Sequence, residues 1–277
     1  MYPNIELFGR EIGLYSIMLL CGIFTAGTYA CIMSIRQKYD YREIIIFMLV
    51  ISAGAIIASY LLYVIINYKN VIYVFKNINQ IDSLKKTLYA LRFIFGGSIF
   101  YGGLLGGLLT GYILIKHNSN NQKFVDIVAI NIPLFHFFGR IGCFLGGCCF
   151  GIPCKTGFNY TNNPIIEANG ITRFPVQLLE AVFNLIIFLL LNHFFNTEKY
   201  KNKLIYVYLL IYATGRFFIE FLRGDAYRGI WLFLSTSQII SILFIFVIFY
   251  RKLSQEFNNG FSEFEWKQSR VYGRKRH

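Results

Sequence analysis

Long apolar stretches separated by short polar segments dominate this chain of 277 residues. An α-helix needs about 20 apolar residues to cross the hydrocarbon core of a bilayer. Seven stretches approach that length, at about residues 13–33, 44–66, 94–115, 124–145, 177–195, 204–222 and 234–250. The pattern therefore predicts an all-α fold: a polytopic integral membrane bundle of about seven transmembrane helices over residues 1–252, followed by a basic tail at 253–277.

Composition supports a membrane protein over a soluble one. The chain is 56% hydrophobic and 15% charged, whereas soluble domains average about 25% charged residues. A net charge of +13 would suit a nucleic-acid partner, but the basic residues lie mostly between the apolar stretches and do not form the polar basic face that nucleic acid requires. The composition also excludes a disordered chain and a disulfide-rich secreted module, because six Cys in 277 residues is an ordinary number.

The distribution of basic residues predicts which end of the chain faces the cytoplasm. Seven spans place the two termini on opposite sides of the membrane. The segments on the side of the C-terminus hold 15 Lys and Arg, against 10 on the other side. Because cytoplasmic segments are enriched in Lys and Arg, we expect an outside N-terminus and a cytoplasmic C-terminus.

The segment at residues 67–93 is too long for a tight turn between two spans. Its apolar residues recur every three or four positions, at Val74, Ile78, Ile81, Leu84, Leu88 and Leu91. This spacing predicts an amphipathic helix. On the outer side of the membrane it would lie at the interface and contact lipid headgroups, or it would be a packing element without lipid specificity.

Glycine is concentrated in and beside the third span, at Gly96, Gly97, Gly102, Gly103, Gly106, Gly107 and Gly111. Small residues four positions apart let two membrane helices approach closely. Most of these glycines therefore indicate a helix-packing face. Others, with Gly102 and Gly103 as candidates, would let a lipid headgroup reach the backbone.

Four ionisable residues lie within or just inside the apolar stretches, namely Arg140, Glu180, Arg216 and Glu220. Such residues are costly in a membrane unless they are paired or hydrated, which makes them functional candidates. On a helix, Arg216, Glu220 and Arg223 would share one face at i, i+4 and i+7. Glu220 would hold one arginine while the other binds an anionic ligand, or Arg216 and Glu220 would only neutralise each other.

His136, Arg140 and Cys143 repeat the same spacing in the fourth span. Arginine binds two oxygens of a phosphate at once through its planar guanidinium. Two helices that carry arginines and converge would therefore form a phosphodiester site. Gln177 and Glu180, at the start of the fifth span, would be partners of the arginines or contacts at a helix end without chemistry, and His136 alone is typical of a buried, hydrogen-bonded histidine.

Four cysteines follow one another closely in the pattern C-x4-C-C-x4-C, at Cys143, Cys148, Cys149 and Cys154. The spacing matches neither a C-x2-C zinc site nor a C-x-x-C redox motif. We expect small packing residues at the end of the fourth span, with Cys143 or Cys148 lining the site, and no metal. A disulfide or redox role is the alternative.

Four segments, in order along the chain, resemble the prolipoprotein diacylglyceryl transferases of bacterial membranes. They are Gly96-Gly97-Ser98 with Tyr101-Gly102-Gly103-Leu104; Phe138-Gly139-Arg140-Ile141-Gly142 continuing to Gly151; Arg173-Phe174-Pro175-Val176-Gln177-Leu178-Leu179-Glu180; and Gly215-Arg216-Phe217 with Glu220-Phe221-Leu222-Arg223. The resemblance spans about residues 8–250, and the Gly-Arg-Ile-Gly block is its most specific part.

The resemblance implies a multi-pass enzyme of the bacterial cytoplasmic membrane. Such an enzyme transfers the diacylglyceryl group of phosphatidylglycerol to the lipobox cysteine of a preprolipoprotein and releases glycerol phosphate. Arg140 and Arg216 match arginines expected to bind the phosphate. Glu220 and Arg223 match the polar residues beside the second arginine, and Gly151 matches the glycine that closes the signature. Membrane lipids are the other expected partners, and no cofactor is indicated.

The sequence departs from the family pattern at four positions. Cys143 and Gly146 stand where the family has Asn, Cys148 stands where it has Glu, and Tyr101 replaces a His before the paired glycines. Tyr101 is the catalytic candidate that remains, but an ordinary phenol with a pKa near 10 is a poor base at neutral pH. The residue that deprotonates the substrate thiol is therefore unassigned.

Three alternatives stay open beside this transferase. A paralogue would use the same phospholipid with another acceptor. A membrane thiol oxidoreductase would use the cysteines from Cys143 to Cys154. A lipid-binding or transport protein would bind phospholipid without forming a product.

Overall fold

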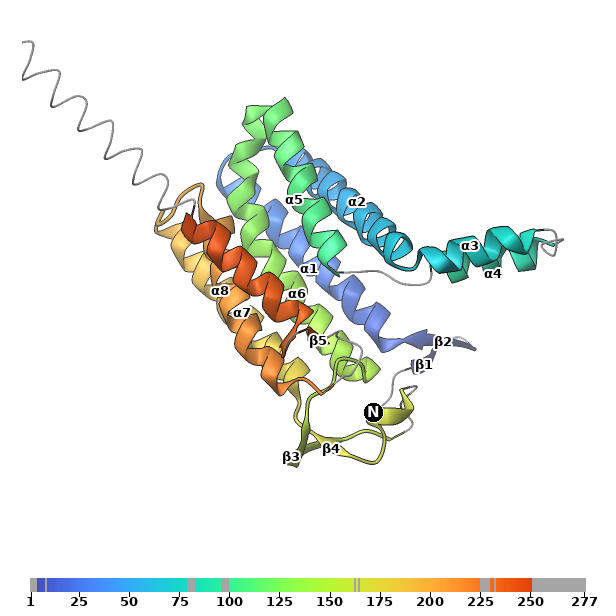
Figure 1. Cartoon of the computed structure of the whole chain (residues 1–277). Helices are drawn as coiled ribbons and strands as arrows, with labels where there is room; N and C mark the ends of the chain where they lie inside the picture. The colour runs from blue at the N-terminus through green and yellow to red at the C-terminus, as the bar shows by residue number, and fades with distance from the viewer. Residues whose placement is uncertain are drawn as a thin grey trace, which may run out of the picture. The chain divides into compact units, whose positions relative to one another are not determined.

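The computed structural model describes residues 4–7, 9–78, 83–95, 100–161, 163, 165–224, 230–231 and 233–250, and helices make up most of them (Figure 1). The α-helices are α1 (Leu14–Arg36), α2 (Tyr41–Ile66), α3 (Tyr68–Lys76), α4 (Leu84–Ile94), α5 (Phe100–His117), α6 (Val125–Gly146), α7 (Val176–Asn196) and α8 (Leu204–Ile219), and an unlabelled helix covers Thr236–Tyr250. Short 3-10 helices cover Ser119–Phe124, Ile166–Ala168 and Glu220–Leu222. Three two-stranded antiparallel sheets pair β1 (Asn4–Leu7) with β2 (Arg10–Gly13), β3 (Pro153–Asn159) with β4 (Thr172–Arg173), and β5 (Ile230–Trp231) with β6 (Leu234–Ser235).

Five helical segments of the described chain are long and apolar enough to cross a membrane. They are Leu14–Arg36, Tyr41–Ile66, Ser119–Gly146, Val176–Asn196 and Leu204–Leu222. These segments coincide with five of the seven predicted spans, and they confirm an all-α, multi-pass membrane protein. Helix α5, with 18 residues, and the shorter apolar helix Thr236–Tyr250 lie at the other two predicted positions, so the number of seven spans stays a prediction.

Two compact units divide the chain, and each is described by itself: residues 27–128 form one, and residues 1–26 with 129–277 form the other. In the first unit, α2 and α5 pack tightly because at their closest contacts a glycine of one helix meets the side chain or backbone of the other. A Cβ atom on Gly106 would lie 2.3 Å from the Cβ of Ala58, and one on Gly54 would lie 2.0 Å from Oγ1 of Thr110. Glycine therefore acts here as the helix-packing residue that the sequence predicts.

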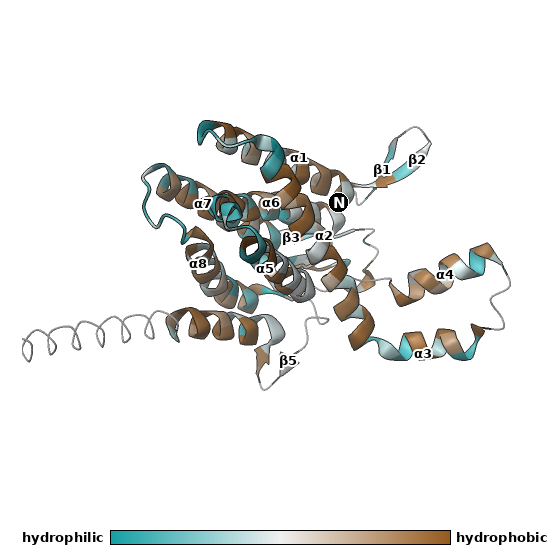
Figure 2. Cartoon of the chain, turned by 90° about the horizontal axis from the view of Figure 1, so that it is seen from above, coloured by the Kyte–Doolittle hydropathy of each residue, from teal (hydrophilic) through white to brown (hydrophobic). Residues whose placement is uncertain are grey.

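The segment at 67–93 contains two helices, α3 and α4, where one was predicted. Helix α4 begins after Ser83, whose Oγ accepts a hydrogen bond from the backbone N–H of Lys86 at 3.4 Å. Figure 2 shows hydrophobic and hydrophilic residues alternating along both helices. The amphipathic character is thus as predicted, and the position of these helices at the membrane interface stays a prediction.

In the second unit, α7 presents one buried face, made of Val176, Gln177, Glu180, Ala181, Asn184, Ile187 and Leu191. Spacings of three and four residues place these side chains on one side of the helix. Helix α8 packs closely on α7, because a Cβ on Gly215 would lie only 2.0 Å from the ring of Phe183. The same face of α7 carries the apolar contacts and the polar residues of the site.

Three backbone segments cross just beyond the end of α6. Gly151 forms an isolated bridge with Arg223, and the N–H of Ile152 donates to the carbonyl of Leu222 at 3.0 Å. A Cβ on Gly151 would lie 2.3 Å from the carbonyl oxygen of Phe174. Packing alone therefore requires glycine at this position. The predicted tail at 253–277 lies outside the described residues.

Candidate active site

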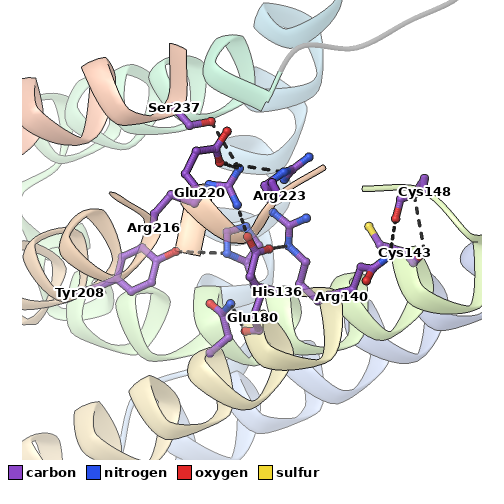
Figure 3. A network of polar contacts seen from close by, with 12 residues as sticks. His136, Arg140, Cys143, Cys148, Glu180, Tyr208, Arg216, Glu220, Arg223 and Ser237 are labelled. Atoms are coloured by element: carbon purple, nitrogen blue, oxygen red, sulfur yellow. Dashed lines mark hydrogen bonds and ion pairs between the residues drawn. The ribbon is translucent and has the colours of Figure 1, made fainter. Parts of the chain in front are cut away.

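Glu180 joins the two intramembrane arginines. One carboxylate oxygen pairs with Nε of Arg140 on α6, and the other pairs with Nη1 of Arg216 on α8. Figure 3 shows the three side chains converging from the three helices. The predicted convergence of two arginine-bearing helices is therefore present, and α7 supplies the carboxylate between them.

Glu220 forms the second half of the cluster. Its Oε2 lies 2.7 Å from Nη2 of Arg216 and 4.0 Å from Nε of Arg223, and its side chain is 1% exposed. The spacing predicts that Arg223 shares a helix face with Arg216 and Glu220, and this prediction is wrong. Helix α8 ends at Ile219 and a 3-10 turn follows, so Arg223 lies beyond the helix. Arg223 has an extended backbone and reaches Glu220 from the end of that turn.

The charges of this cluster do not cancel. Three guanidinium groups face two carboxylates, which leaves one positive charge in a largely buried site. Arg140 has the most exposed of the three arginine side chains, at 20% against 10% for Arg216 and 8% for Arg223. Within the described chain its ion pair with Glu180 is made through Nε. Its Nη groups are therefore the best placed of the cluster to bind an added anion.

His136 lies one turn before Arg140 and packs among tyrosines. Its Nδ1 is 3.3 Å from the hydroxyl of Tyr208, and its ring centroid is 5.5 Å from that of Tyr212. The ring of Tyr212 in turn stacks on that of Tyr208. These contacts suit a histidine that orients its neighbours.

Gln177 contacts the loop after α6 and does not pair with an arginine in the described part of the chain. Its Nε2 donates to the carbonyl of Cys148 at 2.8 Å and contacts the hydroxyl of Tyr160 at 2.9 Å. Tyr160 is fully buried, and burial raises the pKa of its phenol. Of the two polar residues at the start of α7, Glu180 is thus the partner of the arginines and Gln177 positions the cysteine loop.

Three of the four clustered cysteines bring their sulfur atoms together. The Sγ atoms of Cys143, Cys148 and Cys149 all lie within 4.8 Å of one another. Hydrogen bonds from Cys143 and Cys148 lower the pKa of the Cys149 thiol, and the positive charges of Arg223 and Arg140 lower it further. Hydrogen bonds within the same trio raise the pKa of Cys148.

Several residues at the site carry no motif and were not predicted. Ser237 contacts Nη2 of Arg216 at 3.4 Å, Asn163 donates to the carbonyl of Gly147 at 2.7 Å, and Asn184 donates to the carbonyl of Glu180 at 2.8 Å. Tyr15 on α1 lies against α6, where a Cβ on Gly142 would be 3.1 Å from its ring. The one signal that the sequence offers for such residues is an amide side chain within an apolar stretch. Of these four residues, only Asn184 shows it.

Tyr101, Gly102 and Gly103 lie at the start of α5, in the unit at 27–128. The side chain of Tyr101 is outside the described part of the structure. A Cβ on Gly102 would lie 2.6 Å from the carbonyl oxygen of Ala58, and one on Gly103 would lie 3.5 Å from that of Ala55. Both glycines thus face α2, and their contact with a lipid headgroup stays a prediction.

The fold and the site define a multi-pass membrane protein whose helices bury an arginine–carboxylate cluster with one excess positive charge. The chain belongs to the prolipoprotein diacylglyceryl transferase family, which it matches over residues 4–251. It is 35% identical over 246 residues to the phosphatidylglycerol–prolipoprotein diacylglyceryl transferase of Clostridium tetani, covering 87% of this chain and 92% of the relative. The second such transferase of Clostridium perfringens is 32% identical (87% and 90% covered), and that of Clostridioides difficile is 31% identical (93% and 97% covered).

Proposed function

We propose that this protein transfers the diacylglyceryl group of phosphatidylglycerol to the lipobox cysteine of a preprolipoprotein. The observation that carries the proposal is the buried cluster in which Arg140, Arg216 and Arg223 outnumber Glu180 and Glu220. A phosphodiester carries one negative charge, which is the charge that this cluster lacks. The relatives with this activity in their names align with 87–93% of the chain.

The reaction is a displacement at carbon. The cysteine sulfur, without its proton, forms a bond to the glycerol carbon that carries the phosphate. The bond between this carbon and the oxygen attached to phosphorus breaks, and its electron pair leaves with glycerol phosphate. The negative charge on the phosphate therefore increases during the reaction, and preorganised donors that stabilise such charge are often the largest contribution to catalysis.

The arginines have distinct parts in this proposal. Arg140 binds the phosphate through its Nη groups, because its side chain is the most exposed of the three. Glu180 fixes the angle of that guanidinium by pairing with Nε. Arg216 and Arg223 hold Glu220 between them and supply further positive charge behind the phosphate.

The proposal also includes the kind of membrane and the orientation of the chain in it. In a bacterial cytoplasmic membrane with the N-terminus outside, the chain would cross inward in α1, outward in α2, inward in α5 and outward in α6. The end of α6, the start of α7 and the end of α8 would then lie on the outer side. That side is where an exported preprotein presents its cysteine, and the contacts of Gln177 and Gly151 support a common side for these three helix ends.

A mass-spectrometric assay tests this function directly. The purified full chain is mixed in micelles with phosphatidylglycerol and a peptide that contains a lipobox cysteine. We expect a diacylglyceryl mass gain on the cysteine and release of glycerol phosphate. Arg140→Ala should reduce the rate by about 100-fold or more, because removing one preorganised donor commonly has that effect.

The matched control is Arg36→Ala, which removes an exposed arginine from the end of α1 and should leave the rate unchanged. Equal rates for Arg140→Ala and the unmodified protein would refute the role of Arg140. No transfer by the unmodified protein, in a mixture where a relative is active, would refute the function.

A further inference from the structure

The three-thiol group of Cys143, Cys148 and Cys149 is the one group of three candidate metal ligands found among the described residues. Cys143 lies in the last turn of α6, and the other two follow the helix after Gly146. Cys154 is not a member of this group, and its thiol donates to the carbonyl of Thr156 at 2.9 Å. The group therefore consists of three of the four clustered cysteines, which the spacing along the sequence did not predict.

The chain after α6 folds back to bring these thiols together. Gly147 has a φ of 72° and Cys149 a φ of 56°, a left-handed conformation that is uncommon for residues other than glycine and costs about 1 kcal/mol or more. The N–H of Cys148 donates to the carbonyl of Cys143 at 3.1 Å. Asn163 and Gln177 fix the carbonyls of Gly147 and Cys148, so contacts from two other segments hold the turn.

The geometry and charge of the trio suit a thiophilic divalent cation. Thiolates bind Zn²⁺ at about 2.3 Å in a tetrahedron, which places the sulfur atoms about 3.7 Å apart. The observed separations are at most 4.8 Å, which exceeds this value by about 1 Å. Three thiolates and one divalent cation carry a net charge of −1, and the positively charged Arg140 precedes Cys143 by three residues on α6.

We propose that Cys143, Cys148 and Cys149 bind one Zn²⁺ and that the substrate cysteine is its fourth ligand. Three protein ligands leave one position of the tetrahedron open, as in catalytic zinc sites. A thiol that binds zinc loses its proton. The assignment of the substrate cysteine as fourth ligand rests on the proposed function. It explains how the substrate thiol loses its proton, a step for which the sequence comparison with the family assigns no base.

The proposed step balances without an oxidant or reductant. The substrate thiol binds Zn²⁺ and releases its proton to water. Its sulfur then forms a bond to the glycerol carbon, while the carbon–oxygen bond breaks and glycerol phosphate leaves with the electron pair. The product is a neutral thioether, a weaker ligand for zinc than the thiolate, so it leaves and the cation stays on the three cysteines.

Metal binding is tested on the full chain, purified under reducing conditions in detergent. We expect about one Zn²⁺ per chain by elemental analysis, and a sulfur-to-metal charge-transfer absorption when Co²⁺ replaces Zn²⁺. Cys143→Ser, Cys148→Ser and Cys149→Ser should each abolish both signals. Cys154→Ser, in the same loop region, and Cys21→Ser, on α1, are the controls that should keep them.

The fourth ligand is tested on the Co²⁺-loaded protein. A lipobox peptide with cysteine should intensify the charge-transfer absorption, and the same peptide with serine should not. Chelation of the metal should lower the transfer rate by about 100-fold, the usual contribution of a group that handles a proton, and Zn²⁺ should restore it. Thermal unfolding of each variant separates loss of metal from loss of fold.

The outcomes distinguish the two proposals. A chain that stays free of metal with three reduced thiols, or that binds metal without any response to the cysteine peptide, overturns the zinc proposal. Full transfer after chelation also overturns it and leaves the proposed function intact. If metal binds and responds to the peptide while no lipid is transferred, the zinc site stands and the proposed function fails.

Discussion

The helix pair α2–α5 and the charged cluster of α6, α7 and α8 bury their contacts in opposite ways. At the closest points of the first pair one of the two facing residues is a glycine without a side chain, and a Cβ on Gly106 would lie 2.3 Å from that of Ala58. The second group brings long charged side chains together, with Glu180 between Arg140 and Arg216. In lipid, close van der Waals contact and buried polar bonds are both means of helix association.

The difference bears on the proposed function. A glycine at a helix contact has no side chain that could act on a ligand, so the contact serves packing. A buried charge is expensive, and ionisable residues inside membrane helices mark functional sites by default. Variants of the two regions should therefore differ in kind: glycine variants at the helix contact alter stability, and charge variants alter both stability and the reaction.

The largest effect is expected for Glu180→Gln, which would leave Arg140 and Arg216 without their shared carboxylate. Breaking a buried ion pair costs about 3–5 kcal/mol, and the transfer rate should fall by about 100-fold or more because Arg140 loses its fixed angle. Mass-spectrometric rates and thermal unfolding in detergent measure both effects. Glu198→Gln, which removes a surface carboxylate paired with Lys201, should change neither, and an active, stable Glu180→Gln would contradict the role of the cluster.

Gly151→Ala extends the comparison to a glycine beside the charged residues. The added Cβ would lie 2.3 Å from the carbonyl of Phe174, a backbone atom that cannot rotate away. We expect destabilisation by about 3 kcal/mol and lower activity, because Arg223 bridges to Gly151. Gly139→Ala on α6, where a Cβ has nothing within 4 Å, should keep its stability, and any rise in its KM for phospholipid would indicate that the ligand occupies this space.

Two adjacent glycines on α5, Gly106 and Gly107, test the role of packing between α2 and α5. Gly106→Ala should lower the unfolding temperature, with a cost of about 1–3 kcal/mol for overpacking. Gly107→Ala should be neutral or slightly stabilising, because its Cβ would make an ordinary contact of 3.6 Å and alanine favours helices. Thermal unfolding of the two variants decides the point, and equal stabilities would show that α2 and α5 separate easily.

Ser237→Ala is expected to have the smallest effect. It removes one long contact of 3.4 Å to Arg216, while the two carboxylates that hold this guanidinium remain. The loss should be below about 1.5 kcal/mol, with at most a few-fold change in rate. A loss as large as that of Glu180→Gln would mean that Ser237 binds the ligand itself.

The sequence predicted the helices better than the contacts between them. Apolar length located the five described spans to within a few residues, because hydrophobic burial in a bilayer acts along one helix at a time. The segment at 67–93 was wrong in detail, since apolar periodicity hid the break between α3 and α4. Ser83, a typical N-cap residue, was the available signal for the second helix.

The charged residues of the site were predicted as candidates, but only one of their pairings followed from the spacing. Spacing placed Arg216 beside Glu220, and the structure has that pair. Glu180 could equally have been a contact at a helix end, because periodicity along one helix does not fix the register of its neighbours. The cysteine trio was missed for a similar reason: a left-handed turn at Cys149 brings together thiols whose spacing matches no common motif.

The order of charges along the chain also bears on how the protein enters the membrane during synthesis. Arg140 on α6 is followed by Glu180 on α7, so these two helices can be inserted as a neutral hairpin. The next helix brings Arg216 with Glu220 four residues later, and this pair neutralises itself. Each piece of the cluster can therefore leave the insertion machinery without an unbalanced charge, and the excess positive charge arises only when Arg223 reaches Glu220 in the finished fold.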